Sequence, residues 1–269
     1  MLNKAGECYV RNRMKEPITR TRRVLELLFI LAVPLLLITG SVTWAVNDAG
    51  LYHRGFEKYQ ISRYTGITNH DLRQAGADIR HYFNSGEEPL ALRAKVQGVE
   101  REVFNQREVD HMRDVKGLIR GVYWLTALSA AYLLGYVAFG LWRYRYPFIQ
   151  RLARLSLWGG GVTVGLVVAV GLFSLVGFDS LFLLFHQISF SNDLWQLDPR
   201  TDYLIIMFPL GFWFDATMRV ALSAVGFALI LATVAGGYLV YQRWTARLAA
   251  GQPPTPLEGT PSKGTPDAP

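Results

Sequence analysis

The chain has 269 residues, of which 51% are hydrophobic and 18% are charged, and its formal net charge is +7. Soluble domains carry about 25% charged residues, so this composition favours a membrane protein, and its apolar content excludes a mainly disordered chain. The single cysteine, Cys8, excludes a disulfide framework and any site built on paired cysteines.

Four stretches without a charged residue predict membrane spans, at 27–46, 121–142, 155–178 and 220–241. Each is long enough to cross about 30 Å of hydrocarbon as a helix. The first has no small-residue cleavage pattern, so we interpret it as an anchor and not as a signal peptide. In the third, three successive glycines (159–161) predict a close approach to a neighbouring helix.

The distribution of Lys and Arg predicts the orientation of the spans. Basic residues concentrate in the N-terminal tail, between the second and third spans, and after the fourth, whereas 47–116 carries basic and acidic residues in equal number. The positive-inside rule then places both termini in the cytoplasm and the cap on the outer face, and it explains the basic excess without nucleic acid as a partner. The predicted order is a cytoplasmic basic tail (1–23), transmembrane helix 1 (24–46), an extracytoplasmic cap (47–117), helix 2 (118–142), a cytoplasmic loop (143–154), helix 3 (155–178), an extracytoplasmic loop (179–215), helix 4 (216–242) and a disordered cytoplasmic tail (243–269).

Local patterns predict the elements of the cap. Asn69 can cap a helix that ends at Ser85, with its apolar side formed by Leu72, Ala75, Ile79, Tyr82 and Phe83. Residues 95–104 alternate in part and predict a strand or an extended segment. Asn105 and Glu108 have the spacing of a capping box, which predicts a helix that continues directly into the second span.

The start of that helix holds the first chemical cluster. Arg107, His111 and Asp114 are spaced to share one helix face, where Asp114 can fix the tautomer of His111 and raise its basicity. The alternative is a solvated, salt-bridged helix end that lies just outside the membrane.

A second histidine, His186, lies in the apolar and aromatic run 182–195 at the outer end of the third span. An ionisable residue so close to the bilayer is a functional candidate. The alternative is a histidine that only donates a hydrogen bond to a backbone carbonyl. Further along, Asp202 is a candidate N-cap for the next segment.

Both histidines fall at the outer membrane boundary, and a pair of imidazoles suits a base and an acid for acyl transfer. Haem ligation is a rival use, but it favours histidines within spans, and no predicted span contains one. A metal site would need further ligands, for which Asp114 and Asp193 are the candidates.

Two motifs carry a resemblance to a known family. They are Phe104-Asn105-x-Arg107-Glu108-x-x-His111-Met112-x-Asp114-Val115-Lys116 and Phe185-His186-x-x-x-Phe190-x-Asn192-Asp193-x-Trp195. Over roughly residues 24–245 the chain resembles the bacterial lipoprotein intramolecular transacylase (Lit) family. The resemblance implies four helices with an extracytoplasmic cap, a place in the bacterial cell membrane, and two catalytic histidines, His111 and His186.

The resemblance also implies the reaction. The sn-2 acyl chain of a lipoprotein's diacylglyceryl-cysteine moves onto the α-amine of that cysteine, which gives a lyso-form lipoprotein without a cofactor or metal. The partners are then the diacylated lipoprotein N-terminus and the lipid bilayer. The supporting residues that we assign are Arg107, Glu108, Asp114, Asn192 and Asp193, and the candidate walls of the substrate pocket are Phe182, Phe185, Phe190, Trp195 and Trp213.

A different class of function stays open at this point. The protein would then be a non-enzymatic membrane protein that binds a ligand or partner through its outer cap, with a footprint around residues 69–83.

Overall fold

The computed structural model describes residues 20–249 and 251. Cys8 and most of the predicted C-terminal tail, 252–269, lie outside the described residues.

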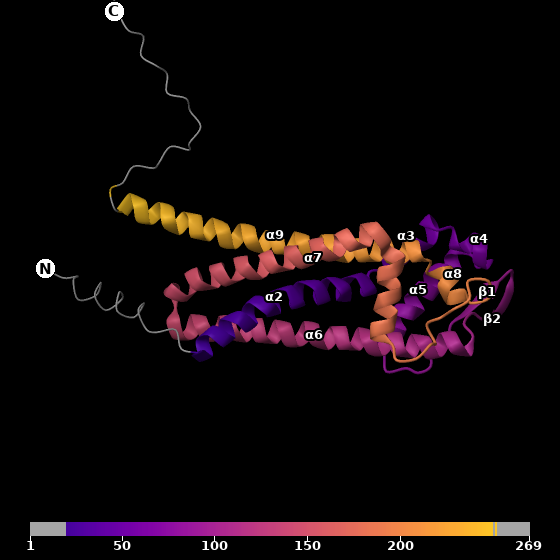
Figure 1. Ribbon diagram of the computed structural model, residues 1–269. Helices are drawn as coiled ribbons and strands as arrows, with labels where there is room; N and C mark the ends of the chain where they lie inside the picture. Colours follow the sequence, from indigo (N-terminus) through magenta and orange to yellow (C-terminus); the bar gives the residue numbers. More distant parts are fainter. Residues whose placement is uncertain (1–19, 250, 252–269) are drawn as a thin grey trace, which may run out of the picture.

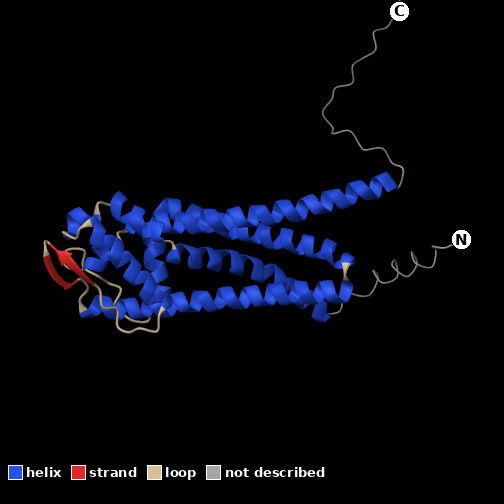
Figure 2. Cartoon of the chain, turned by 180° about the vertical axis from the view of Figure 1, so that it is seen from behind, coloured by secondary structure: helices blue, strands red, loops and turns tan. Residues whose placement is uncertain are grey.

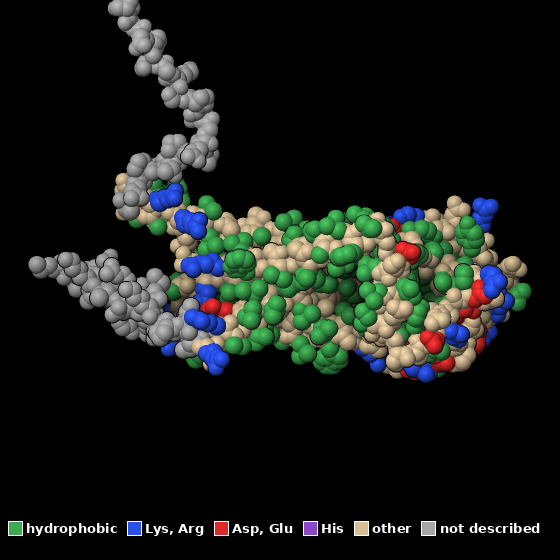
Figure 3. All heavy atoms as spheres, in the orientation of Figure 1, with side chains coloured by type: hydrophobic (Ala, Val, Ile, Leu, Met, Phe, Trp, Pro, Cys, Tyr) green, Lys and Arg blue, Asp and Glu red, His purple; other side chains and the backbone are tan. Residues whose placement is uncertain are grey.

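Four long helices form a bundle: α2 (Arg20–Asn47), α6 (Gln106–Tyr144), α7 (Tyr146–Ser189) and α9 (Leu210–Ala249) (Figure 1). Each contains a window apolar enough to cross a membrane, which confirms that there are four spans. The helices extend beyond the predicted spans, so most of the predicted loop 143–154 and residues 243–249 of the predicted disordered tail are helical. Large apolar side chains cover the middle of the bundle, whereas charged side chains gather towards its two ends (Figure 3). The fold is therefore that of an all-α multi-pass membrane protein.

The glycine run of α7 makes the close approach that its sequence predicts. A methyl group on Gly159 would lie 2.7 Å from Cβ of Val33 on α2, and one on Gly160 would lie 3.4 Å from the carbonyl oxygen of Ala228 on α9. A methyl group on Gly161 would meet no atom within 4 Å. The first two glycines therefore allow the backbones of neighbouring helices to pack closely.

The cap lies at one end of the bundle and consists of short elements (Figures 1 and 2). They are α3 (Ala49–Lys58), α4 (Ile61–Thr65), α5 (Asn69–Asn84), β1 (Arg93–Val96), β2 (Val99–Glu102) and α8 (Tyr203–Met207). The predicted apolar face of α5 is buried at all five positions, and it shares one core with Met112 of α6 and Phe212 of α9. Because the cap and the long helices share this core, α6 is held at its first turns.

Two local predictions in the cap need correction. The N-cap of α5 is Thr68, whose side chain accepts a hydrogen bond from the Asp71 amide, and Asn69 is the first helical residue. Segment 95–104 does not form a single strand, because most of it belongs to the antiparallel hairpin of β1 and β2. Gln97 and Gly98 both have positive φ, the conformation that a tight two-residue hairpin turn requires.

A sharp turn in α7 at Gly177 positions the functional site. Gly177 has φ −165° and ψ 69°, which interrupts the helix. The helical residues after it, 178–189, cross the bundle from the side of α9 towards α6 (Figure 1). The predicted outer loop 179–215 therefore begins with a helix, and we call 178–189 the crossing segment.

Candidate active site

The structure brings the two predicted histidines together. His111 lies on the second turn of α6 and His186 on the crossing segment, with 6.2 Å between their ring centroids. Both are buried, at 6% and 9% exposure. Both also lie outside the uncharged stretches 121–142 and 155–178, at the junction between cap and bundle. They meet because the turn at Gly177 carries the end of α7 over to α6.

The tautomer of His186 follows from one hydrogen bond. Its Nδ1 lies 2.8 Å from the carbonyl oxygen of Phe182, one turn earlier on the crossing segment. A carbonyl can only accept, so Nδ1 carries the proton, and in the neutral ring Nε2 keeps a free lone pair. Burial lowers the pKa of His186, and the bond to Phe182 opposes that shift. His186 can therefore donate this hydrogen bond through Nδ1 and still act chemically through Nε2.

His111 lies in a less polar setting. Its Nδ1 is buried and has no hydrogen-bond partner among residues 20–249, and its ring packs edge-on against Phe190 with centroids 5.0 Å apart. The pKa of His111 is lowered to about 4, mainly by burial and to a smaller extent by the proximity of His186. The charge of Asp114 acts in the opposite direction and raises the pKa. His111 is therefore uncharged at neutral pH.

Asp114 does not make the hydrogen bond that would fix the tautomer of His111, although its charge raises the pKa of that ring as predicted. Its carboxylate accepts a hydrogen bond from the Asn192 amide at 2.8 Å and makes none with His111. The reason is that the chain after the crossing segment folds back onto α6 and places an amide donor beside this carboxylate.

Arg107 holds the same returning loop. Its guanidinium donates to the backbone carbonyls of Asp193, at 2.5 Å, and Leu194, at 3.5 Å. The Asp193 carboxylate accepts from Gln196 within the loop. Arg107 and Asp114 on α6 therefore fix the loop that carries Trp195.

Four of the five predicted wall residues contact His186, and the fifth, Trp213, packs behind Phe182. The ring of Phe182 lies 4.3 Å from that of His186, centroid to centroid, and the ring of Trp195 lies 5.2 Å from it. Phe185 and Phe190 follow at 5.3 and 5.6 Å, and Trp213 of α9 contacts Phe182 at 5.8 Å. These rings exclude water from the two imidazoles, which is the cause of the lowered pKa values.

Glu108 has a structural role away from the histidine pair. Its carboxylate is fully buried and accepts from the backbone amides of Asn105, at 2.8 Å, and Leu204, at 2.6 Å. The first bond completes the predicted capping box, and the second ties α8 to α6. Asp202 precedes α8 as predicted, but its carboxylate accepts from the Asn105 side chain and the Asp198 amide and does not cap the helix.

Sequence reasoning missed Gly177, and it anticipated a backbone carbonyl as the partner of His186 without identifying that of Phe182. A glycine at the end of an uncharged stretch is a weak signal of a turn, and a backbone carbonyl leaves no signal in a sequence. As for metal ligands, no group of three or more His, Cys, Asp or Glu could hold an ion within the part of the chain that the structure describes.

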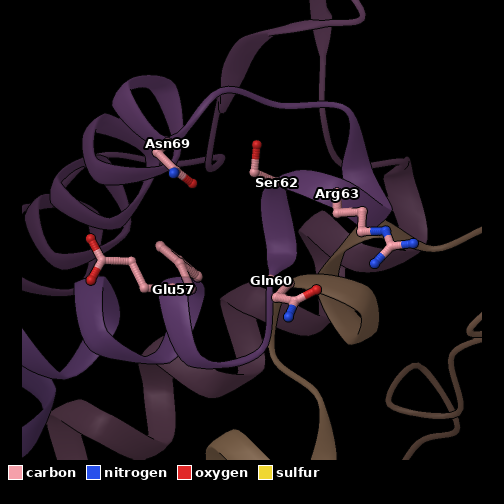
Figure 4. Close-up of a pocket in the computed structure, with 6 residues that line it drawn as sticks. Glu57, Gln60, Ser62, Arg63 and Asn69 are labelled. Atoms are coloured by element: carbon pink, nitrogen blue, oxygen red, sulfur yellow. The ribbon is translucent and has the colours of Figure 1, made fainter.

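A separate, polar pocket of about 400 Å³ opens on the cap (Figure 4). It lies between α3, α4 and the start of α5, and its lining consists of Phe56, Glu57, Gln60, Ser62, Arg63 and Asn69. It shares no lining residue with the histidine site. Asn69 belongs to the cap face on which a binding function would depend.

Comparison with known proteins matches the chain to the model of one family and to a related sequence. The model of the family described as lipoprotein intramolecular transacylase Lit matches residues 27–213 of this chain. An uncharacterized protein of Aquifex aeolicus (strain VF5) is 28% identical over 135 residues. That match covers 49% of this chain and spans only 56% of the relative's length.

Solved structures share the fold. The membrane-integral lipoprotein intramolecular transacylase Lit from Bacillus cereus has a TM-score of 0.70 at 20% identity, covering 83% of this chain and 97% of its own. A variant of that protein with one histidine replaced by arginine has a TM-score of 0.66 at 18% identity, with coverages of 91% and 100%. The overall fold therefore recurs in a distant relative.

Proposed function

Because the chain belongs to the lipoprotein intramolecular transacylase Lit family, we propose that it is a membrane acyltransferase that acts on diacylglyceryl-cysteine lipoproteins. It moves the sn-2 acyl chain onto the α-amine of the cysteine and leaves a lyso-form lipoprotein. The observation that carries the proposal is the buried pair of His111 and His186, which come from distant parts of the chain and lie 6.2 Å apart inside an aromatic enclosure.

The reaction needs no co-reactant. The amine nitrogen bonds to the sn-2 ester carbonyl carbon, the bond from that carbon to the glyceryl oxygen breaks, and one amine proton ends on this oxygen. The products are an amide and a free hydroxyl on the same molecule. A cyclic transition state of this kind is entropically unfavourable in a flexible lipid, so a tight enclosure that holds both ends supplies effective molarity.

The hydrogen bonding supports different roles for the two histidines. Nε2 of His186 carries a free lone pair. His186 therefore acts as the base that takes the amine proton and returns it to the glyceryl oxygen. His111 stays neutral because of its lowered pKa, and its ring N–H stabilises the oxyanion as a neutral donor. Arg107, Asp114, Asn192 and Asp193 act as positioning residues through the loop that carries Trp195.

The charge distribution supports an outward-facing site. The start of α2, the junction of α6 and α7 and the end of α9 lie at the end of the bundle opposite the cap (Figure 1). Basic side chains gather at this end (Figure 3). The helix ends that lie there contain Arg23, Arg151 and Arg243. By the positive-inside rule this end is cytoplasmic, so both termini are inside and the histidines face the outer leaflet.

The test uses purified protein and a synthetic diacylglyceryl-cysteine lipopeptide. Transfer leaves the mass unchanged, so the product is identified by tandem mass spectrometry and by loss of the free amine. We expect His111→Ala and His186→Ala each to lower the rate by about 10²-fold or more. His70→Ala is the control, since this cap side chain is 92% exposed.

Glutamine variants separate the roles. His111→Gln keeps a neutral N–H donor and retains part of the activity, whereas His186→Gln has no base and loses it. Wild-type rates in both alanine variants would refute the assigned site. Unchanged substrate with folded wild-type protein and several lipopeptides would refute the enzyme and favour a binding protein that uses the cap.

A further inference from the structure

A second cavity lies within the membrane-spanning part of the bundle, between α2, α7 and α9. Its volume is about 130 Å³, and none of the described residues that line it is charged. Three helices line this groove: α2 contributes Ile38, α7 contributes several residues between 166 and 174, and α9 contributes several residues between 217 and 224. An apolar cavity of about 150 Å³ holds benzene, so this groove has room for an alkyl segment and none for a lipid headgroup.

The groove is open because small residues line it. Gly171 is half-buried, and a methyl group built on it would meet no atom within 4 Å. Opposite it on α9 stand Ala221 and the fully buried Ala224. The buried hydroxyl of Ser174 donates to the carbonyl of Val170 one turn earlier, so it is satisfied within the helix and presents no polar site to a ligand.

A column of aromatic rings joins the groove to the histidines. Met218 lines the groove, and Phe214 lies one turn above it on α9. The ring of Phe214 contacts that of Phe178 at 5.3 Å, Phe178 contacts Phe182 at 6.0 Å, and Phe182 contacts His186 at 4.3 Å. A continuous line of aromatic contacts therefore runs from the helical turn above the groove to His186.

The dimensions suit the distal part of a fatty acyl chain. Ser174, at the top of the groove, is twelve residues from His186, which is at most about 18 Å along a helix at 1.5 Å per residue. The groove extends from residue 174 to 166, about 12 Å further down α7 by the same rise. A chain whose carbonyl lies at His186 thus reaches the groove only with its methyl end.

We propose that this groove binds the methyl end of the migrating sn-2 acyl chain and so sets the chain length that the enzyme prefers. The inference rests on the proposed transacylase function, which identifies the carbonyl at His186 as that of the sn-2 ester. The retained sn-1 chain has no carbonyl at this position, and its length has no comparable effect.

Filling the groove tests the inference. Gly171→Leu places a side chain in the open space, and Gly165→Leu is the matched control on the same helix, because Gly165 is equally free of neighbours within 4 Å but does not line the groove. The substrates are lipopeptides with lauroyl, myristoyl, palmitoyl or stearoyl at sn-2 and one fixed chain at sn-1, and a second series with the positions exchanged.

For Gly171→Leu we expect the ratio of kcat/KM for stearoyl to that for lauroyl at sn-2 to fall by about tenfold or more, since one methylene in a hydrophobic pocket is worth at least that factor. Gly165→Leu keeps the wild-type ratio. Equal ratios in both variants, or a shift that follows the sn-1 chain, would overturn the inference while the transacylase stands.

Photo-crosslinking gives a readout that does not need turnover. A lipopeptide with a diazirine at the methyl end of the sn-2 chain should label residues within 166–174 or 217–224, as mapped by mass spectrometry, and Gly171→Leu should abolish this labelling. Labelling elsewhere contradicts the inference even in an inactive protein. Equal labelling by a phospholipid with the same chain would reduce the groove to a contact with bulk lipid.

Discussion

The contact of Gly159 with Val33 leads to a prediction about the packing of α2 against α7. In Gly159→Ala the new methyl carbon would lie 2.7 Å from Cβ and about as close to both methyl groups of Val33. Val33 is buried, and a β-branched side chain in a helix has one strongly preferred rotamer. It cannot turn aside, so the two helices must separate.

The magnitude follows from a matched comparison. Overpacking of this kind destabilises by about 1 to 3 kcal/mol. Exchanging glycine for alanine inside a helix stabilises by about 1 kcal/mol, and Gly161→Ala receives this gain without the clash, since nothing lies within 4 Å. The difference between the two variants is therefore the cost of the clash, about 1 to 3 kcal/mol, or roughly 2 to 12 °C in Tm for a chain of this size.

The assay is thermal unfolding in detergent at one heating rate. The fraction of folded protein is measured from the monodisperse peak in size-exclusion chromatography, which is lost on unfolding. We expect Gly159→Ala to unfold below Gly161→Ala, and Val33→Ala to recover part of the difference when combined with Gly159→Ala. If Gly159→Ala unfolds at or above the temperature of Gly161→Ala, the reasoning is refuted.

Three further predictions concern the site. Burial lowers the pKa of His111 to about 4, so its NMR signals should stay those of a neutral ring as the pH falls from 7 to 5. Because the unfolded chain takes up a proton on His111 near pH 6.5, the free energy of unfolding should also fall between pH 7 and 5. A His111 ring that titrates near pH 6.5 in the folded protein would contradict the prediction. Glu108→Ala leaves the buried Leu204 amide without its acceptor and should destabilise by about 1 to 3 kcal/mol, whereas the exposed Glu102→Ala should change little, as measured by thermal unfolding. Asp114→Asn should slow acyl transfer by less than tenfold, because this carboxylate binds Asn192; a loss of about 10⁴-fold, typical of a carboxylate that orients a catalytic histidine, would restore the role predicted from sequence.

The sequence by itself determined the features that depend on local composition and spacing. A run of some twenty uncharged residues must be helical in a membrane, because its backbone polar groups find no other partners there. The capping box of Asn105 and Glu108 is likewise encoded by two residues three apart, and it forms as predicted. The buried face of α5 follows from helical spacing alone. The same local reasoning placed His111 and His186 at the ends of spans.

Only the tertiary structure decided which groups meet. The turn at Gly177 directs His186 towards His111, and helix-forming residues on both sides of the glycine conceal that turn in the sequence. Asp114 and Glu108 each bind a group from a segment more than 75 residues away, Asn192 in a loop and Leu204 in α8. A carboxylate accepts from whichever donor the fold brings nearest, and spacing along the helix records only the neighbours on its own element.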